Sequence, residues 1–198
     1  MNIIEQIEQI KLIPVIQLKK ETDAEPLAAA LCEGGLAAAE ITFRTDAAEA
    51  SIAKMCRAFP KMLIGAGSLI NTEQARRAKQ AGAQFFVTAG FNRSVTEYAI
   101  DNQIPIFPGI CTPTELMLLL EYRLPIAKFF PAQQMGGVSM IKALSAPFPQ
   151  MRFMPTGGIN TENVMDYLKL PCVIACGGSF MVKDGLIAAG DFREITRL

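Results

Sequence analysis

The sequence contains no histidine among its 198 residues. Histidine is the commonest metal ligand in proteins and the usual acid or base near neutral pH. Its absence argues against a zinc enzyme and against a hydrolase that pairs a serine with a histidine. Any proton transfer at an active site of this chain therefore falls to glutamate, aspartate, lysine, tyrosine or cysteine.

The chain also lacks an excess of charge of either sign. It has 19 basic and 19 acidic residues and no long block of like charge. Nothing in this balance favours a nucleic acid or a membrane surface as partner. No apolar run reaches the roughly 18 to 20 residues of a membrane helix. The first residues lack the basic region of a signal peptide.

The number and spacing of the cysteines suggest no disulfide pairing. Five cysteines are present, an odd number, and none forms a CxxC motif. This usage is typical of reduced thiols, so we expect a cytoplasmic protein. The 51% share of hydrophobic residues provides ample material for a core. At this length, without a linker or a shift in composition, we expect one domain over residues 1–198.

Short apolar runs alternate with segments of helical periodicity along the whole chain. A short amphipathic helix comes first, over residues 2–11, and eight strand–helix units follow it. Strands that are hydrophobic on both faces indicate a parallel sheet covered by helices, and eight units predict a closed (β/α)8 barrel. A doubly wound open sheet is the alternative, although the first strand-to-helix turn has no GxGxxG motif. The expected strands are 12–18, 38–43, 62–67, 84–88, 104–107, 126–130, 152–155 and 173–176.

Capping signals mark several of the helix starts. Asp46, Asn71 and Thr112 are each followed three residues later by Glu or Gln, which is the spacing of a capping box. Pro113 adds a proline at a first helical position. The helices expected after the strands are 23–34, 46–59, 71–82, 93–102, one from 112, 137–145, 160–168 and a last piece over 190–198.

Lys128 stands in a run, Ile126 to Phe130, that otherwise reads as a buried strand. Uncompensated burial of an ammonium group costs roughly several kcal/mol, so its presence there requires a reason. One reason is chemical, because a desolvated lysine amine can attack a carbonyl carbon. A structural, ion-paired core lysine is the alternative.

Glu40, Thr42 and Arg44 share one face of the second expected strand, because strand side chains alternate. Catalytic groups of a barrel lie at the C-terminal ends of its strands. A carboxylate there can move protons while a lysine forms an iminium, and the planar fork of Arg44 suits a substrate carboxylate. A structural ion pair of Glu40 with Arg44 or Lys128 is the alternative. Hydroxyl groups at other strand ends, taken as further substrate ligands, are those of Ser68, Thr88 and Thr156.

Glycine pairs follow the last two expected strands. Gly157-Gly158 comes after the seventh, and Gly177-Gly178 with Ser179 comes after the eighth. Such pairs let backbone N–H groups approach an anion closely, and a helix start after each would add its positive end. Barrels commonly bind phosphate on these loops, so we predict a phosphate site there. A tight turn or a carboxylate site is the alternative.

A carbonyl-forming lysine, a carboxylate base, a carboxylate clamp and a phosphate site together favour carbon–carbon bond chemistry on a small-molecule 2-keto acid phosphate. Two other functions fit part of this pattern. One is a sugar-phosphate epimerase or isomerase, with Glu40 and Lys128 as two proton-transfer groups. The other is an inactive sensor or scaffold that retains only the phosphate site.

The same residues resemble those of a known family, the class I 2-keto-3-deoxy-6-phosphogluconate (KDPG) / 4-hydroxy-2-oxoglutarate (KHG) aldolases. The resemblance covers nearly the whole chain, with several motifs in the same order and spacing. Those motifs are Pro14-Val15-Ile16, Glu40 to Thr45, Gly65 to Ser68, Pro108-Gly109-Ile110, Thr112 to Glu115, Lys128 to Ala132, Pro155 to Ile159 and Gly177-Gly178-Ser179.

This resemblance implies a (β/α)8 barrel, usually a homotrimer, that cleaves its substrate reversibly to pyruvate and an aldehyde without metal or cofactor. By position, Lys128 would be the Schiff-base lysine, Glu40 the acid/base and Arg44 a ligand of the pyruvate carboxylate. Phe130 would pack beside the iminium. Phosphate would be held by Gly157, Gly158, Gly177, Gly178 and Ser179. The substrate would be KDPG, KHG or an epimer such as the galactonate analogue.

Three positions depart from the pattern of that family. Ser68 replaces the usual threonine, Ala89 replaces a proline beside the pyruvate pocket, and Gln133 replaces a glutamate after the lysine motif. None of them is Lys128, Glu40 or Arg44, so the expected reaction class is unchanged.

Overall fold

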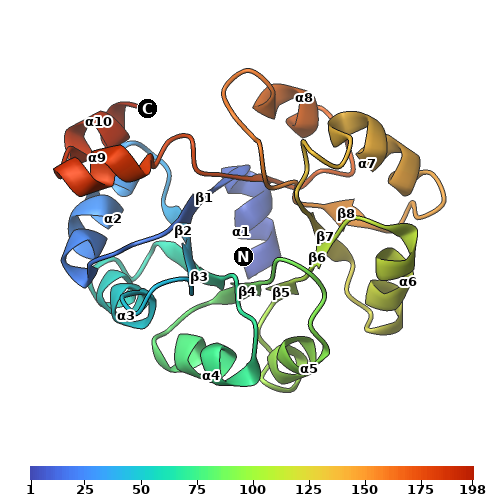
Figure 1. Cartoon of the computed structure of the whole chain (residues 1–198), viewed down its shortest axis with the longest axis horizontal. Coiled ribbons are helices and arrows are strands. Elements are labelled where there is room, and N and C mark those ends of the chain that lie inside the picture. The colour runs from blue at the N-terminus through green and yellow to red at the C-terminus, as the bar shows by residue number, and fades with distance from the viewer.

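The computed structural model describes residues 1–198 and shows a ring of parallel strands surrounded by helices (Figure 1). The strands are β1 (Leu12–Ile16), β2 (Ala38–Thr42), β3 (Leu63–Gly67), β4 (Phe85–Val87), β5 (Ile106–Phe107), β6 (Gly109–Ile110), β7 (Ile126–Phe129), β8 (Arg152–Phe153) and β9 (Cys176–Gly178). They pair in the orders β5-β4-β3-β2-β1-β9 and β6-β7-β8.

The two strand groups join into one ring at both ends. Pro108 alone separates β5 from β6, and proline has no N–H to give to a ladder. Parallel bridges between Phe153 and Val173 and between Thr156 and Gly177 connect the β8 side to the β9 side. The predicted (β/α)8 barrel is therefore confirmed.

Helices of moderate length pack around the strands. They are α1 (Ile3–Ile10), α2 (Ala24–Glu33), α3 (Ala48–Ala58), α4 (Thr72–Gln80), α5 (Arg93–Asp101), α6 (Pro113–Glu121), α7 (Gly137–Ser145), α8 (Val164–Leu168), α9 (Asp184–Ala189) and α10 (Phe192–Arg197), with a 3-10 turn over Glu21–Asp23. Two of the predicted caps are present: Asn71 accepts from the third helical residue of α4, and Thr112 forms a full capping box with Glu115. None of these helices combines the length and the hydropathy needed to cross a lipid bilayer.

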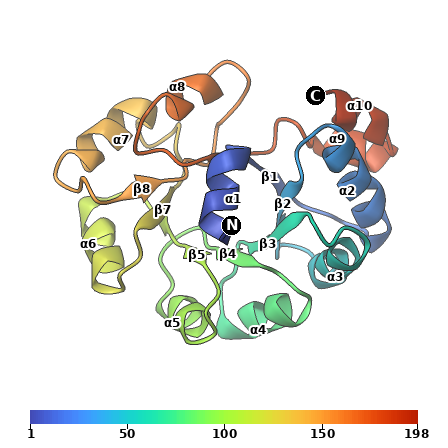
Figure 2. The same cartoon turned by 180° about the vertical axis from the view of Figure 1, so that it is seen from behind.

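The helix α1 closes one end of the barrel. It lies across the opening when the molecule is seen from behind (Figure 2), and Ile7 on its inner face is fully buried. Ile7 packs in a cluster with inward-facing side chains of the strands, among them Phe85 and Phe107, whose rings meet edge to face at 5.8 Å between centroids. The barrel interior is therefore filled at this end, and access is from the opposite, C-terminal end of the strands.

Several sequence-based boundaries are wrong. The capping box expected at Asp46 is absent, because α3 begins after Ala47 without a side-chain cap. The last strand pairs with β1 over Cys176–Gly178 rather than covering residues 173–176. The helix expected from Asn160 begins at Val164, because Asn160 and Asn163 accept backbone N–H groups in a turn instead. The last helical piece expected over residues 190–198 is present as α10, but the short helix α9 before it was not expected.

Candidate active site

Lys128 and Glu40 meet inside the barrel at the open end. The Lys128 Nζ donates to Glu40 Oε1 at 3.4 Å, and the two residues are 4% and 0% exposed. They are the only charged residues that are buried in the chain. The ion pair considered from the sequence alone is therefore present, between Glu40 and Lys128 and not between Glu40 and Arg44.

Strand alternation explains why both side chains point inward. On β2, Ala39 and Ile41 pack outward against the helices, so Ala38, Glu40 and Thr42 face the interior. On β7, Ala127 and Phe129 pack outward, which leaves Lys128 facing Glu40. The Thr42 hydroxyl donates to the Ile16 carbonyl at 3.0 Å and ties β2 to β1 beside the pair.

Glycine on the neighbouring strand makes room for the carboxylate. A Cβ at Gly67 would lie 2.0 Å from Glu40 Oε1, a separation that real atoms do not reach. Glycine at this position thus permits the close approach of β3 to the Glu40 side chain. Any larger residue at this position would displace the carboxylate from its present place beside Lys128.

Two buried polar atoms near the open end have no partner in the protein. They are Oε2 of Glu40 and the hydroxyl of Thr88, which follows β4. Buried polar groups are nearly always hydrogen-bonded, and each exception requires an explanation. A free carboxylate oxygen beside an amine is an arrangement that can accept a proton from a bound molecule.

Phe130 lies close to the pair, and Thr156, another predicted substrate ligand, follows the neighbouring strand β8. The Phe130 ring centroid is 5.3 Å from Lys128 Nζ, and Phe130 has the same strand parity as the lysine. Thr156 is buried after β8, where its hydroxyl donates to the Met154 carbonyl at 3.4 Å.

Two further predicted ligands lie beyond the strand ends. Ser68, directly after β3, is half-buried with a left-handed φ of 57°. Arg44 is exposed in the turn after β2 and forms no ion pair, so its expected place on the face of the strand is wrong: β2 ends at Thr42. It lines a small hollow of about 160 Å³ together with Gln74 and Arg77.

The two glycine pairs differ in structure. Gly157 and Gly158 form a turn after β8 in left-handed conformations, with φ of 98° and 75°. Gly177 and Gly178 instead lie inside β9, which corrects their expected position after the strand. A Cβ at Gly177 would come within 2.4 Å of the Thr156 hydroxyl, so that glycine makes room for Thr156. Ser179 is the first exposed residue after β9.

Backbone donors gather at these two strand ends. The N–H groups of Gly157, Gly158 and Ile159, and those of Ser179 and Phe180, donate to no acceptor in the protein. Successive N–H groups in such turns form a concave site for an anion. The expected helix dipoles are absent from this site, because α8 and α9 begin several residues after the glycines.

The comparison with known proteins identifies the family. Residues 3–198 match the family model described as KDPG and KHG aldolase. The 2-dehydro-3-deoxy-phosphogluconate aldolase of Treponema pallidum is 45% identical over 197 residues, which cover 100% of this chain and 94% of that protein. The KHG/KDPG aldolase of Escherichia coli is 42% identical over 187 residues, 94% of this chain and 88% of that protein. The chain belongs to the KDPG and KHG aldolase family.

A solved aldolase extends this agreement to the structure. The crystal structure of KDPG aldolase from Legionella pneumophila has a TM-score of 0.93 and 39% identity, and the match covers 97% of this chain and 95% of that one. In that protein pyruvate is captured at low pH as a covalent carbinolamine intermediate. The prediction of an aldolase, a carbon–carbon lyase, is thus confirmed at the level of the family.

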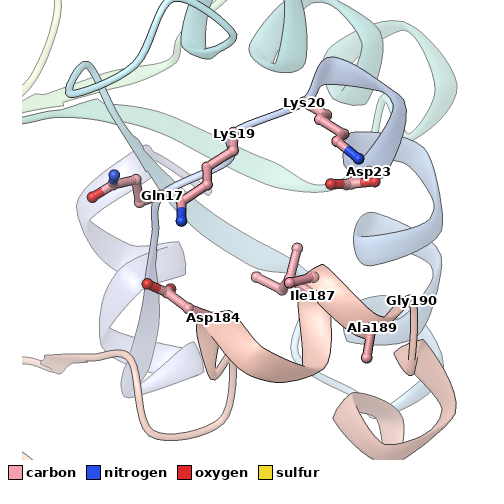
Figure 3. Close-up of a pocket in the computed structure, with 9 residues that line it drawn as sticks. Gln17, Lys19, Lys20, Asp23, Asp184, Ile187, Ala189 and Gly190 are labelled. Carbon is pink, nitrogen blue, oxygen red and sulfur yellow. The ribbon is translucent and has the colours of Figure 1, made fainter.

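One feature of this aldolase was not anticipated from the sequence. A hollow of about 320 Å³ opens on the rim beside β1 and α9, where Gln17, Lys19, Asp23 and Asp184 line it (Figure 3). Lys19 and its neighbour Lys20 are exposed and form no ion pair. The rule that strand ends carry function also applies to residues 17 to 20, which directly follow β1. No group of three or more Cys, Asp or Glu side chains is placed to hold a metal ion.

Proposed function

We propose that residues 1–198 form one domain that acts as a class I aldolase and releases pyruvate through a Schiff base on Lys128. The observation that carries the proposal is the buried pair of Lys128 and Glu40, in which one carboxylate oxygen has no partner. A purely structural ion pair would be expected to satisfy both oxygens, since each unpaired buried acceptor is unfavourable. The pair is instead arranged to receive a substrate.

The reaction uses the amine and the carboxylate in turn. Glu40 takes a proton from the Lys128 ammonium group, and the amine so freed adds to the keto carbon. Glu40 then returns that proton to the carbinolamine hydroxyl, which leaves as water and gives the iminium. Glu40 takes the proton of the β-hydroxyl as the bond between the α and β carbons breaks, and the electrons of that bond move into the iminium to form an enamine. After the aldehyde leaves, the α carbon takes up a proton, and water hydrolyses the iminium to pyruvate and the free amine.

The surrounding residues are proposed to bind the substrate. Arg44, exposed after β2, would reach the carboxylate of the keto acid, and Phe130 would pack beside the iminium. The hydroxyls of Ser68, Thr88 and Thr156 would hydrogen-bond the substrate oxygens. Phosphate would be held by the free N–H groups of the two turns, with Gly157, Gly158, Gly177, Gly178 and Ser179 as the site.

KDPG and KHG are the proposed substrates, cleaved to pyruvate with glyceraldehyde 3-phosphate or glyoxylate. Relatives at 42–45% identity carry these two activities in their names, which supports this assignment. A structure of a KDPGal protein is more distant, at 26% identity with a TM-score of 0.80, so we rank the galactonate epimer second. Membership of an aldolase family disfavours the epimerase and the inactive sensor.

The proposal includes a homotrimer and a cytoplasmic location. The trimer rests on the sequence resemblance alone, and light scattering on the purified chain tests it. The cytoplasmic location is supported by the five cysteines, which are all free thiols in the structure. We propose no nucleic acid, membrane or cofactor partner.

Borohydride reduction in the presence of pyruvate tests the central claim. We expect irreversible formation of a carboxyethyl adduct on Lys128, located by peptide mass spectrometry, and none on the half-buried Lys54 or the exposed Lys169. An unmodified Lys128, under conditions that label another class I aldolase, would refute the Schiff base. A coupled lactate dehydrogenase assay over phosphorylated and unphosphorylated aldol acids then ranks the substrates.

A further inference from the structure

A buried tyrosine reaches from α8 to the turn that follows β7. Tyr167 is 1% exposed, and its hydroxyl donates to Gln133 Oε1 at 2.8 Å. Burial raises the pKa of this phenol from its usual 10.0, so the hydroxyl keeps its proton and donates throughout the neutral range. Gln133 lies five residues after Lys128, at the same end of the barrel.

Gln133 in turn contacts both glycines of the turn after β8. Its backbone N–H donates to the Gly157 carbonyl at 3.0 Å. A Cβ at Gly158 would lie 2.5 Å from Gln133 Cβ, so this glycine packs directly on the glutamine side chain. On the other side, the Asn163 amide donates to the Gly158 carbonyl at 2.9 Å. Each glycine carbonyl therefore accepts one hydrogen bond, that of Gly157 from Gln133 and that of Gly158 from Asn163.

Holding these carbonyls also sets the direction of the free N–H groups. A peptide unit is planar, so fixing the C=O of one residue fixes the N–H of the next. The bond to the Gly157 carbonyl sets the Gly158 N–H, and the bond to the Gly158 carbonyl sets the Ile159 N–H. Two of the donors proposed to bind phosphate thus depend on Gln133 and on Asn163.

We propose that Tyr167 and Gln133 are positioning residues that hold the Gly157–Gly158 turn ready for the phosphate group of the substrate. The two side chains hydrogen-bond each other, whereas the partner of Lys128 is Glu40. Their loss therefore weakens binding of a phosphorylated substrate and leaves an unphosphorylated one unaffected. This inference rests on the proposed function, since it assigns a role within its phosphate site.

The test removes only the hydrogen bond. Tyr167→Phe deletes the donor, and Gln133→Met deletes the acceptor at a surface position with a chain of similar length. Tyr122→Phe is the matched control, because the exposed Tyr122 hydroxyl donates to Glu97 at 3.0 Å on another helix. We expect KM for KDPG to rise about fivefold in both test variants, as for loss of one ordinary hydrogen bond, with kcat within about twofold. KM for KHG should stay unchanged, as should both constants in the control.

Equal rises of KM for the two substrates, or the same rise in Tyr122→Phe, would overturn the positioning role. Inorganic phosphate provides a readout that does not depend on catalysis. The dissociation constant of phosphate, obtained from thermal stabilisation of each variant, should be higher for Tyr167→Phe and Gln133→Met than for Tyr122→Phe. If the wild-type chain cleaves no aldol acid, the proposed function fails. The phosphate measurement then decides the positioning role alone: a selective loss supports it, and equal binding overturns it.

Discussion

Lys128 and Glu40 are the only buried charges of a chain whose interior is otherwise apolar. Taking two charges out of water costs on the order of several kcal/mol per ion, and their mutual attraction offsets this only with good geometry. Their 3.4 Å separation and the unpaired Oε2 are not the geometry of a strong structural pair. The pair therefore serves stability poorly, which agrees with a role in proton and carbonyl chemistry.

Replacing the carboxylate tests that role directly. Glu40→Gln keeps the shape of the side chain but cannot accept a proton, so we expect kcat for KDPG cleavage to fall by about 10² to 10⁴. Glu49→Gln is the control, because Glu49 pairs with Arg77 on the surface at 2.7 Å. Steady-state kinetics with the lactate dehydrogenase coupling measures both. A Glu40→Gln enzyme with unchanged kcat would assign proton transfer to another group.

Cys176 makes the free energy of unfolding depend on pH in the alkaline range. Burial raises the pKa of this thiol from 9.0 to about 12 in the folded chain. Between those values the unfolded chain has lost the thiol proton and the folded chain has kept it, so the free energy of unfolding falls as pH rises. We expect this effect to lower the free energy of unfolding by roughly 1 kcal/mol at pH 10. Urea denaturation of wild type and Cys176→Ala from pH 8 to 10 measures it, and equal slopes would contradict the prediction.

Strands and helices differ in how far the sequence determined them. Most strands are apolar runs, so burial on both faces identified them, and strand parity placed Glu40 and Lys128 inside the same barrel. The strand at Cys176–Gly178 was missed in part because glycine has no strand preference of its own. It is a strand only because it pairs with Leu12, Ile13 and Pro14 of β1.

The start of the helix after the Gly157–Gly158 turn was also missed, for a physical reason. Asn160 reads as an N-cap, but an asparagine side chain can hydrogen-bond a turn equally well. Here Asn160 and Asn163 close such a turn, and α8 begins only at Val164. The predicted position of Arg44 was wrong for a similar reason, since nothing in the sequence marks Thr42 as the last paired residue of β2.

The packing of β3 against β2 gives a further test. Gly67→Ala would put a methyl group 2.0 Å from Glu40 Oε1, so the carboxylate must leave its present position beside Lys128. We expect kcat to fall at least about tenfold, since small misplacements of catalytic groups are costly. Gly185→Ala is the control, because its Cβ would meet nothing within 4 Å. Circular dichroism should show both variants folded, and full activity in Gly67→Ala would contradict the packing argument.

The charge of the whole molecule is balanced, so any attraction of an anionic substrate is local. Lys19 and Lys20 lie unpaired on the rim beside the hollow of about 320 Å³, at the open end of the barrel (Figure 3). Positive charge beside a mouth raises the rate at which an anion enters, and salt screens that effect.

Neutralising the two rim lysines should therefore change the salt dependence of the reaction. We expect Lys19→Gln/Lys20→Gln to lower kcat/KM for KDPG about two- to fivefold at low ionic strength, and to flatten its decline as salt is added. The change at high salt should be small. Lys61→Gln/Lys79→Gln is the control pair, on the surface away from this hollow. The same loss at every salt concentration would indicate direct contact with the substrate instead.

The helix α1 has a kinetic consequence for a barrel that is closed at one end. Ile7 and the aromatic rings of β4 and β5 block the far opening, so molecules enter and leave past the same rim. In the proposed reaction pyruvate stays bonded to Lys128 after the aldehyde is cut off, and the water that frees it must arrive by the route along which the aldehyde departs. Product release is then ordered, with the aldehyde first and pyruvate last. In the reverse direction pyruvate must bind before the aldehyde, so an aldehyde that enters an empty barrel acts as an inhibitor.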